Sequence, residues 1–273
     1  MSKLIALDAG HGRYTAGKRC LKSLDPNETR EWVLNNRIAG YIAAMLTEYN
    51  CRTMRVDDTT GATDVPLLTR CARANNAGAD FFLSVHHNAG INGKSGGGVC
   101  AFIATTASAT SRKMRDLMYK YVVEETSLKG NRAQPLLETN FTVVYSTNMP
   151  AVLFEYGFMD SPTDIKYILT DKFAQQAARG SVRAIVEILA LKRIAQPVPE
   201  TPASDEPTET DMGVEVADMS PPSWAKTSCD KAIAAGIFQG NGNGDYMWDE
   251  LMTRAQVAVV LDRLGLINNK TEE

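Results

Sequence analysis

Long apolar runs, closely spaced cysteines and an excess of basic residues are all missing from this sequence. No window approaches the roughly 18 uninterrupted apolar residues of a membrane-spanning helix, so we expect no membrane span. The formal net charge is −3 at pH 7, with 29 basic and 32 acidic residues, which disfavours nucleic acid as a partner. The N-terminal apolar stretch ends at Asp8 and is shorter than a signal peptide requires. We therefore expect a protein that is made in the cytoplasm without a signal peptide.

Cysteine is also scarce. The five cysteines are Cys20, Cys51, Cys71, Cys100 and Cys229. Their number is odd and none forms a C-x-x-C pair, which argues against a disulfide framework and against a cysteine zinc site. We expect free, mostly buried thiols that behave as small apolar side chains.

What is present is the composition of a globular protein with one interruption. The chain has 273 residues, of which 44% are hydrophobic and 22% are charged. Residues 196–210 contain four prolines and four acids among small polar residues, which is typical of a solvated linker. We predict an N-terminal domain at 1–193, a Pro-rich acidic linker at 194–213 and a small helical C-terminal domain at 214–268.

Strand-like and helix-like patterns alternate along the N-terminal domain. Such alternation predicts an α/β fold with a twisted, mostly parallel sheet and helices on both faces. Sheets of this kind place their ligands at the carboxyl ends of the strands. The predicted strands are 4–8, 51–56, 80–86, 98–105 and 151–155, and the predicted helices are 31–49, 66–76, 108–125 and 171–193.

The histidines concentrate at predicted strand ends. The sequence has only three, His11, His86 and His87. His11 follows the first strand and His86 ends another, so both would project to the same rim of the sheet. A divalent metal is one reason to gather them there. Two unrelated polar turn residues would give the same pattern, and this alternative stays open at the level of spacing.

Two carboxylates are candidates to complete a site. Glu31 opens the first helix, where an acid also suits the helix dipole without any further role. Glu155 interrupts an otherwise apolar strand. A carboxylate at the end of a buried strand is expected to be paired, metal-bound or functional.

Four sequence blocks occur in a recognisable order. They are LDAGHG at 7–12, EWVLNNRIA at 31–39, LTRCARAN at 68–75 with ADFFLSVHHNA at 79–89, and MPAVLFEYGFMD at 149–160. On these blocks, residues 1 to about 192 resemble the zinc-dependent N-acetylmuramoyl-L-alanine amidases of bacterial autolysins and phage endolysins, the amidase-3 type.

The resemblance implies roles for individual residues. His11, Glu31 and His86 would be ligands of Zn²⁺, and Glu155 would be the catalytic carboxylate. Glu28 is a rival to Glu31, which we prefer because the rest of its block then falls in register. Three protein ligands leave a fourth zinc position for a water molecule.

The resemblance also implies a reaction and a substrate. Zinc-activated water would cut the amide between N-acetylmuramic acid and L-alanine of the peptidoglycan stem peptide, after release by phage lysis or non-classical export. Arg70 and Asn88 would orient the site or contact substrate, although Arg70 could equally be a surface charge of its helix. The alternatives are a zinc peptidase that cuts within the stem peptide and a non-catalytic wall-binding protein.

The C-terminal residues have a pattern of their own. Residues 214–268 include the Gly-rich GNGNG at 240–244 and TRAQ at 253–256, followed by an apolar helical stretch. This resembles a single S-layer-homology motif, which implies binding to a secondary cell-wall polymer. One copy buries little surface, so a structural or self-associating helix pair, with a homo-oligomer as the product, is the alternative.

Overall fold

The computed structural model describes residues 2–194, 226–237, 260 and 264. The chain divides into two compact units, Met1–Glu200 and Thr201–Glu273. The predicted linker lies outside the described residues from residue 195 onward, and most of the predicted C-terminal module lies outside them as well.

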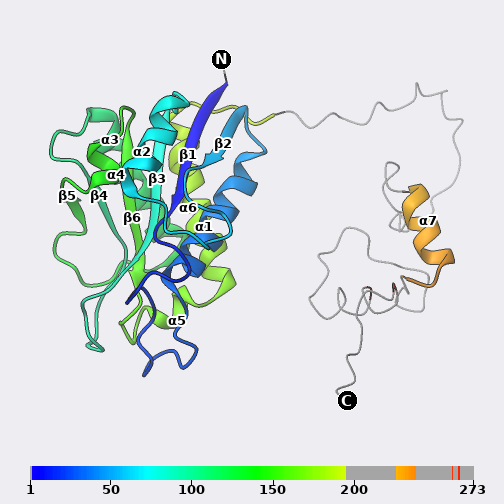
Figure 1. The fold of residues 1–273 in the computed structure, drawn as a ribbon, viewed down its shortest axis with the longest axis horizontal. Coiled ribbons are helices and arrows are strands. Elements are labelled where there is room, and N and C mark those ends of the chain that lie inside the picture. The colour runs from blue at the N-terminus through cyan, green and yellow to red at the C-terminus, as the bar shows by residue number, and fades with distance from the viewer. Residues whose placement is uncertain (1, 195–225, 238–259, 261–263, 265–273) are drawn as a thin grey trace, which may run out of the picture. The chain divides into compact units, whose positions relative to one another are not determined.

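A six-stranded sheet organises the first unit, with the strand order β2-β1-β3-β6-β4-β5 (Figure 1). Neighbouring strands are parallel except for β4 and β6, which are antiparallel. The mostly parallel α/β sheet is therefore confirmed. The strands are β1 (Lys3–Ala9), β2 (Cys51–Arg55), β3 (Phe81–Asn88), β4 (Cys100–Ile103), β5 (Leu136–Glu138) and β6 (Ala151–Phe158).

Helices cover both faces of this sheet (Figure 1). One core cluster joins the sheet to α1, α3 and α6, and a second joins its other face to α2 and α4. With both faces covered, β1 and β3 are buried along nearly their whole length, which explains their continuous apolar runs. The helices are α1 (Glu31–Leu46), α2 (Leu67–Asn76), α3 (Ala109–Thr126), α4 (Thr142–Tyr145), α5 (Ile165–Ile168) and α6 (Asp171–Ile188).

Every predicted strand and helix of the first unit has a counterpart, but the final helix is shorter than predicted. The pattern predicts a helix to residue 193, whereas α6 ends at Ile188. Ala190 takes a left-handed φ of 50°, and the Leu191 amide donates to the Val186 carbonyl. This turn ends the helix as a left-handed C-terminal residue commonly does. Leu191 is buried although it lies beyond the end of the helix. The apolar pattern therefore continues past the helix and made the predicted helix too long.

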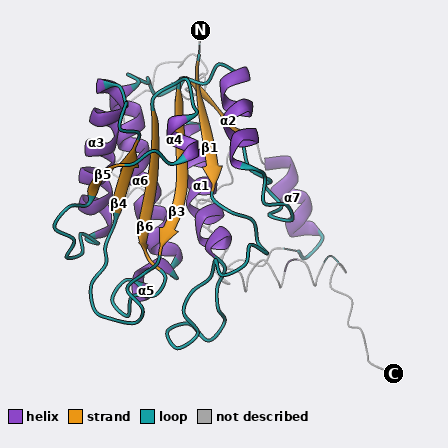
Figure 2. Ribbon diagram, turned by 60° about the vertical axis from the view of Figure 1, so that its left-hand side comes forward, coloured by secondary structure: helices purple, strands orange, loops and turns teal. Residues whose placement is uncertain are grey.

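The parallel strands β1, β3 and β6 end at one edge of the sheet, where long loops gather (Figure 2). This edge carries every side chain that the sequence singled out as a metal ligand. The loop of residues 12–30 follows β1, and residues 89–99 follow β3. The fold thus places the candidate site where parallel sheets usually bind their ligands.

The described part of the second unit centres on one helix, α7 (Lys226–Ala234). The chain turns after it at Gly236, whose φ is 69°, and the Ile237 amide donates to the Ala232 carbonyl. This helix lies inside the predicted C-terminal module, whose remaining helix and Gly-rich loop are outside the described residues. Among the helices that the structure describes, none is long and apolar enough to cross a membrane.

Candidate metal centre

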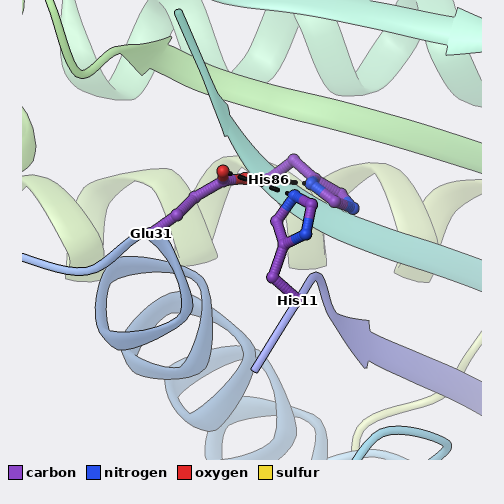
Figure 3. Close-up of side chains that lie close together, drawn as sticks. All are labelled: His11, Glu31 and His86. Atoms are coloured by element: carbon purple, nitrogen blue, oxygen red, sulfur yellow. Dashed lines mark hydrogen bonds and ion pairs between the residues drawn. The ribbon is translucent and has the colours of Figure 1, made fainter. Parts of the chain in front are cut away.

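Three side chains from separate elements meet at the carboxyl edge of the sheet (Figure 3). His11 comes from the turn after β1, Glu31 is the first residue of α1, and His86 lies near the end of β3. Each offers one ligand atom, and these atoms all lie within 4.8 Å of one another. The structure therefore brings together the three residues that the sequence predicted as metal ligands.

Glu31 is the centre of this cluster. Its Oε1 lies 3.0 Å from His86 Nδ1, and its Oε2 lies 3.4 Å from His11 Nε2 without a hydrogen bond. Burial opposes ionisation of Glu31, but the hydrogen bond from His86 and the charges of both histidines outweigh it and lower its pKa to about 2. Glu31 is thus an ionised carboxylate in a buried place, which requires a positive partner.

The two histidines differ in their electrostatic environment. Burial lowers the pKa of His11 to about 4, although Glu31 acts in the opposite direction. His86 is also penalised by burial, but its hydrogen bond to Glu31 raises its pKa above the ordinary value. The rings stand edge to face with their centroids 5.0 Å apart. Two imidazoles and a carboxylate at this spacing are a ligand set that zinc accepts.

The turn that carries His11 is built for close packing. His11 takes a left-handed φ of 65°, a conformation that histidine adopts more readily than most residues. The Gly10 amide donates to the Val85 carbonyl at 3.0 Å, so β1 stays paired with β3 up to the site. A Cβ at Gly10 would overlap the His86 ring. Only glycine leaves that ring its observed position.

Two further polar residues, Asn35 and His87, support the cluster, and sequence reasoning assigned neither this role. The buried Asn35 amide nitrogen donates to the Gly10 carbonyl at 3.1 Å and approaches Glu31 Oε1 at 3.4 Å. Its oxygen lies 2.8 Å from His87 Nδ1, which must then be the donor. The His87 amide donates to Glu31 Oε1 at 3.3 Å. The Glu-x-x-x-Asn spacing, one helical turn, was the available signal.

Arg70 is buried behind the His11 turn. None of its side chain is exposed, so the alternative of a surface charge is wrong, and the guanidinium has no free surface for direct contact with substrate. It pairs with Asp8 at 2.6 Å and Asp64 at 2.9 Å and donates to the His11 carbonyl at 3.0 Å. The buried charge is compensated because Nε donates to the Val65 carbonyl and each terminal nitrogen donates to two acceptors.

Glu155 stands opposite His86 in the parallel register of β3 and β6. Register partners on adjacent parallel strands project to the same face, so the carboxylate lies beside the ligand cluster. Its Oε2 is buried without a hydrogen-bond partner. Burial, together with the nearby negative charge of Glu31, raises its pKa to about 7 despite the opposing effect of His86. The structure thus shows a buried carboxylate at this strand position, and its catalytic role stays a prediction.

The remaining predicted residues are less central. Glu28 pairs with Arg19 at 3.3 Å and is not part of the ligand cluster, which favours Glu31 over its rival. Asn88 ends β3 partly buried, and its amide nitrogen approaches Cys100 Sγ at 3.7 Å. A substrate contact for Asn88 stays a prediction.

All five cysteines are free thiols, as predicted, and they differ in how deeply they are buried. Three are buried and two are partly exposed. Burial raises the pKa of the Cys20 thiol to about 12 and that of the Cys100 thiol to about 11. Neither thiol belongs to the ligand cluster, which stays two histidines and one glutamate.

Comparison with known proteins agrees with this geometry. The N-acetylmuramoyl-L-alanine amidase family model matches residues 5–187. The endolysin of Bacillus phage SPP1 is 31% identical over 196 residues, which cover 71% of this chain and 68% of the endolysin. The CwlM N-acetylmuramoyl-L-alanine amidase of Bacillus licheniformis is 29% identical over 191 residues, covering 70% of each chain.

Solved structures show the same relationship. The N-acetylmuramoyl-L-alanine amidase of Clostridium difficile 630 superposes with a TM-score of 0.62 at 27% identity, over 69% of this chain and 97% of that one. The family match spans the sheet, the ligand cluster and Glu155. On its sequence, its fold and the arrangement of its site, this chain belongs to the N-acetylmuramoyl-L-alanine amidase family.

Proposed function

We propose that this chain is a zinc-dependent peptidoglycan hydrolase that cuts the amide between N-acetylmuramic acid and L-alanine of the stem peptide. The observation that carries the proposal is the cluster of His11, Glu31 and His86 beside the buried carboxylate of Glu155. The family membership supports the bond that is cut, because the matched relatives are named for it.

The residues of the cluster fit a zinc ion. His11 and His86 each present a ring nitrogen, and Glu31 Oε2 is buried without a hydrogen-bond partner. A buried carboxylate oxygen that has no hydrogen-bond donor and lies beside two imidazoles is stabilised by a bound cation. When bound, zinc would polarise the scissile carbonyl and lower the pKa of a coordinated water molecule.

The protein side of the reaction falls to Glu155 and to the groups that hold the ligands. Glu155 Oε2 has no partner within the described residues, so it is free to take a proton from the attacking water. The same oxygen would then give that proton to the nitrogen of the leaving L-alanine amine. Asn35 and Arg70 hold the Glu31 carboxylate and the His11 turn in place.

Mass spectrometry of digested peptidoglycan tests the reaction. Purified Gram-positive walls would be incubated with the protein, with and without a chelator. We expect intact stem peptides with a new L-alanine amine and glycan free of peptide, both abolished by the chelator. New ends inside the stem peptide would instead support the zinc peptidase. A protein that binds zinc yet releases nothing from several wall types, or that binds no zinc, would support the wall-binding alternative.

Glu155→Gln separates the carboxylate from the metal centre. The amide has nearly the same shape but cannot accept the proton, so we expect normal zinc content with activity reduced by at least about 10²-fold. His86→Ala should lose both zinc and activity. Glu138→Gln, at an exposed strand end, is the matched control and should behave as wild type. Normal turnover by Glu155→Gln would contradict the catalytic assignment.

We further propose that the chain works as a phage or prophage endolysin, which reaches the wall only when the cell lyses. The similarity to the endolysin of Bacillus phage SPP1 supports this. Fractionation of expressing cells tests it. The protein is expected in the cytosolic fraction until the membrane is permeabilised, and its appearance in the medium of intact cells would overturn the proposal.

A further inference from the structure

The segment of residues 12–30 is fixed over one side of the ligand cluster. A hydrogen bond ties this segment to the start of α1: the Glu31 amide donates to the Lys18 carbonyl at 3.0 Å. Arg19 and Arg30 form an antiparallel bridge in the same place. The Leu21 amide donates to the Met159 carbonyl after β6. The backbone of Lys18 is therefore fixed next to Glu31, the first residue of α1.

The side chain of Lys18 faces the ligands. Its Nζ lies 3.9 Å from Glu31 Oε2, the carboxylate oxygen that lacks a hydrogen bond. The Lys18 side chain is also 45% exposed, so the ammonium group reaches the cluster and solvent at once.

Two other basic residues of this segment are engaged elsewhere. The guanidinium of Arg13 lies 5.1 Å from the centre of the Trp32 ring, and Arg19 pairs with Glu28. Within the described part of the chain, Lys18 is the lysine whose ammonium comes within 4 Å of a cluster carboxylate. Its position is thus particular among the basic residues of the segment.

We propose that Lys18 is a specificity residue that binds a carboxylate of the substrate close to the scissile amide, which selects acidic stem peptides. The inference rests on the proposed function. A divalent cation bound to Glu31 would repel the Lys18 ammonium group. It would also neutralise the Glu31 carboxylate, to which the ammonium group is now attracted. Lys18 would then turn to its exposed side, where it can reach a peptide bound over the site.

An acidic peptide is the substrate class that fits this position. The scissile amide leads into L-alanine, so the next residue of the stem peptide is the first that can carry a carboxylate near the site. A charge-assisted hydrogen bond from lysine to that carboxylate discriminates against the uncharged carboxamide. The preference should be expressed in substrate binding, because Lys18 touches none of the reacting atoms.

A matched pair of synthetic substrates tests the inference. Both are N-acetylmuramoyl dipeptides that begin with L-alanine and whose chain-terminal carboxyl group is blocked as a methylamide. The remaining carboxyl group of the second residue is either a free carboxylate or the corresponding carboxamide. We expect the zinc-loaded wild-type protein to show about a tenfold lower KM for the carboxylate, with similar kcat. Lys18→Gln should lose this preference, and Lys18→Arg should keep part of it. Lys22→Gln, an exposed lysine of the same segment, is the control and should keep it fully.

Binding measured without turnover gives an independent readout. In the Glu155→Gln background, calorimetry should show the same preference for the carboxylate and its loss on addition of Lys18→Gln. Zinc content and thermal melting of Lys18→Gln should match wild type, which shows that the site is intact. Equal KM values for the two substrates in the wild-type protein would overturn the role of Lys18 and leave the amidase function standing. Failure to cut either substrate, or any larger muropeptide, would instead count against the proposed function.

Discussion

At the residue scale, the ligand cluster depends on buried polar side chains that do not belong to it. Arg70 donates to the His11 carbonyl from behind, while Asn35 spans Gly10 and Glu31. His87, whose pKa burial lowers to about 3, stays neutral and fixes the Asn35 amide. Each of these contacts limits the movement of a ligand, and such supporting groups commonly change metal affinity when mutated.

Arg70 is expected to be the most sensitive of them. Its removal leaves Asp8 buried beside Ser84 without its cation, so Arg70→Met should cost about 3–5 kcal/mol in the free energy of unfolding. Arg70→Lys keeps the charge but loses the planar set of guanidinium donors that holds the His11 turn. We therefore expect it to weaken zinc binding at least tenfold. Chemical denaturation and zinc titration measure the two effects. Arg179→Lys, on the surface near Glu125, should change neither. Wild-type zinc affinity in Arg70→Lys would show that charge alone suffices.

Two glycines give opposite expectations for the same substitution. A Cβ at Gly10 would overlap the His86 ring, whereas a Cβ at Gly40, exposed on α1, meets nothing within 4 Å. Gly10→Ala should therefore displace His86 and reduce zinc affinity by at least tenfold. Gly40→Ala should leave zinc affinity unchanged and raise stability by about 0.5–1 kcal/mol through helix propensity. Equal zinc affinity in both variants, measured by competition with a chromogenic chelator, would contradict the packing argument.

The sequence predicted the residues with direct chemistry better than those that support them. His11, His86 and Glu155 stand out as polar residues at the ends of apolar strands, and the sequence blocks selected Glu31. Arg70 was predicted to orient the site or contact substrate, but a surface charge stayed an equal alternative, because an arginine on an amphipathic helix usually faces water. Its burial depends on three acceptors from a distant part of the chain, the Asp8 carboxylate and the Ala9 and His11 carbonyls, and such a tertiary arrangement leaves no local pattern.

At the scale of elements, long periodic segments were predicted and short ones were not. β5 has three residues, and α4 and α5 have four each, which is too short for a period of 2 or 3.6 to be recognised. β5 becomes a strand by pairing with β4. The antiparallel direction of β4 against β6 is likewise a property of tertiary pairing, which a sequence of alternating elements does not encode locally.

The junction between β1 and β3 supports a pH prediction. Asp80 accepts hydrogen bonds from Lys3 Nζ at 2.7 Å and from the Leu4 amide at 2.8 Å. Partial burial opposes ionisation of Asp80, but these bonds outweigh it and lower its pKa. A depressed pKa adds stability above the ordinary value of about 4, and this stability is lost as the pH falls through the folded-state value.

Asp80→Asn should therefore reduce stability by about 1 kcal/mol at pH 7. The deficit should begin to shrink as the pH falls below about 4, where the unfolded wild-type chain takes up a proton, and should disappear below the lowered pKa of the folded state. Urea unfolding at a series of pH values measures the difference. Asp116→Asn, an exposed acid on α3, makes the same change in net charge and should show a much smaller deficit. A pH-independent deficit in Asp80→Asn would contradict the electrostatic explanation.

At the scale of the whole molecule, the first unit contains the entire sheet and every residue of the site. Its last described residues still pair with the turn after α1, since the Ile194 amide donates to the Glu48 carbonyl at 2.8 Å. A chain that ends at residue 194 should therefore keep its zinc, its melting temperature and its activity on soluble muropeptides.

The same truncation tests the C-terminal module. If residues 214–268 bind a secondary cell-wall polymer, the shortened chain should no longer sediment with intact walls. Sedimentation equal to that of the full chain would contradict a wall-binding role. Size-exclusion chromatography of both chains tests the alternative of self-association, which predicts a loss of the oligomer on truncation.

The position of β6 in the sheet determines when during synthesis the candidate site can be completed. It lies between β3 and β4, yet it is the last strand of the sheet to be synthesised. The proposed metal ligands all precede residue 87, whereas the Glu155 carboxylate joins them only when β6 enters the gap between the two halves of the sheet. A nascent or prematurely ended chain thus carries a complete ligand set without its proton acceptor. If Glu155 is the catalytic carboxylate, competence for hydrolysis would begin with the same step that completes the sheet.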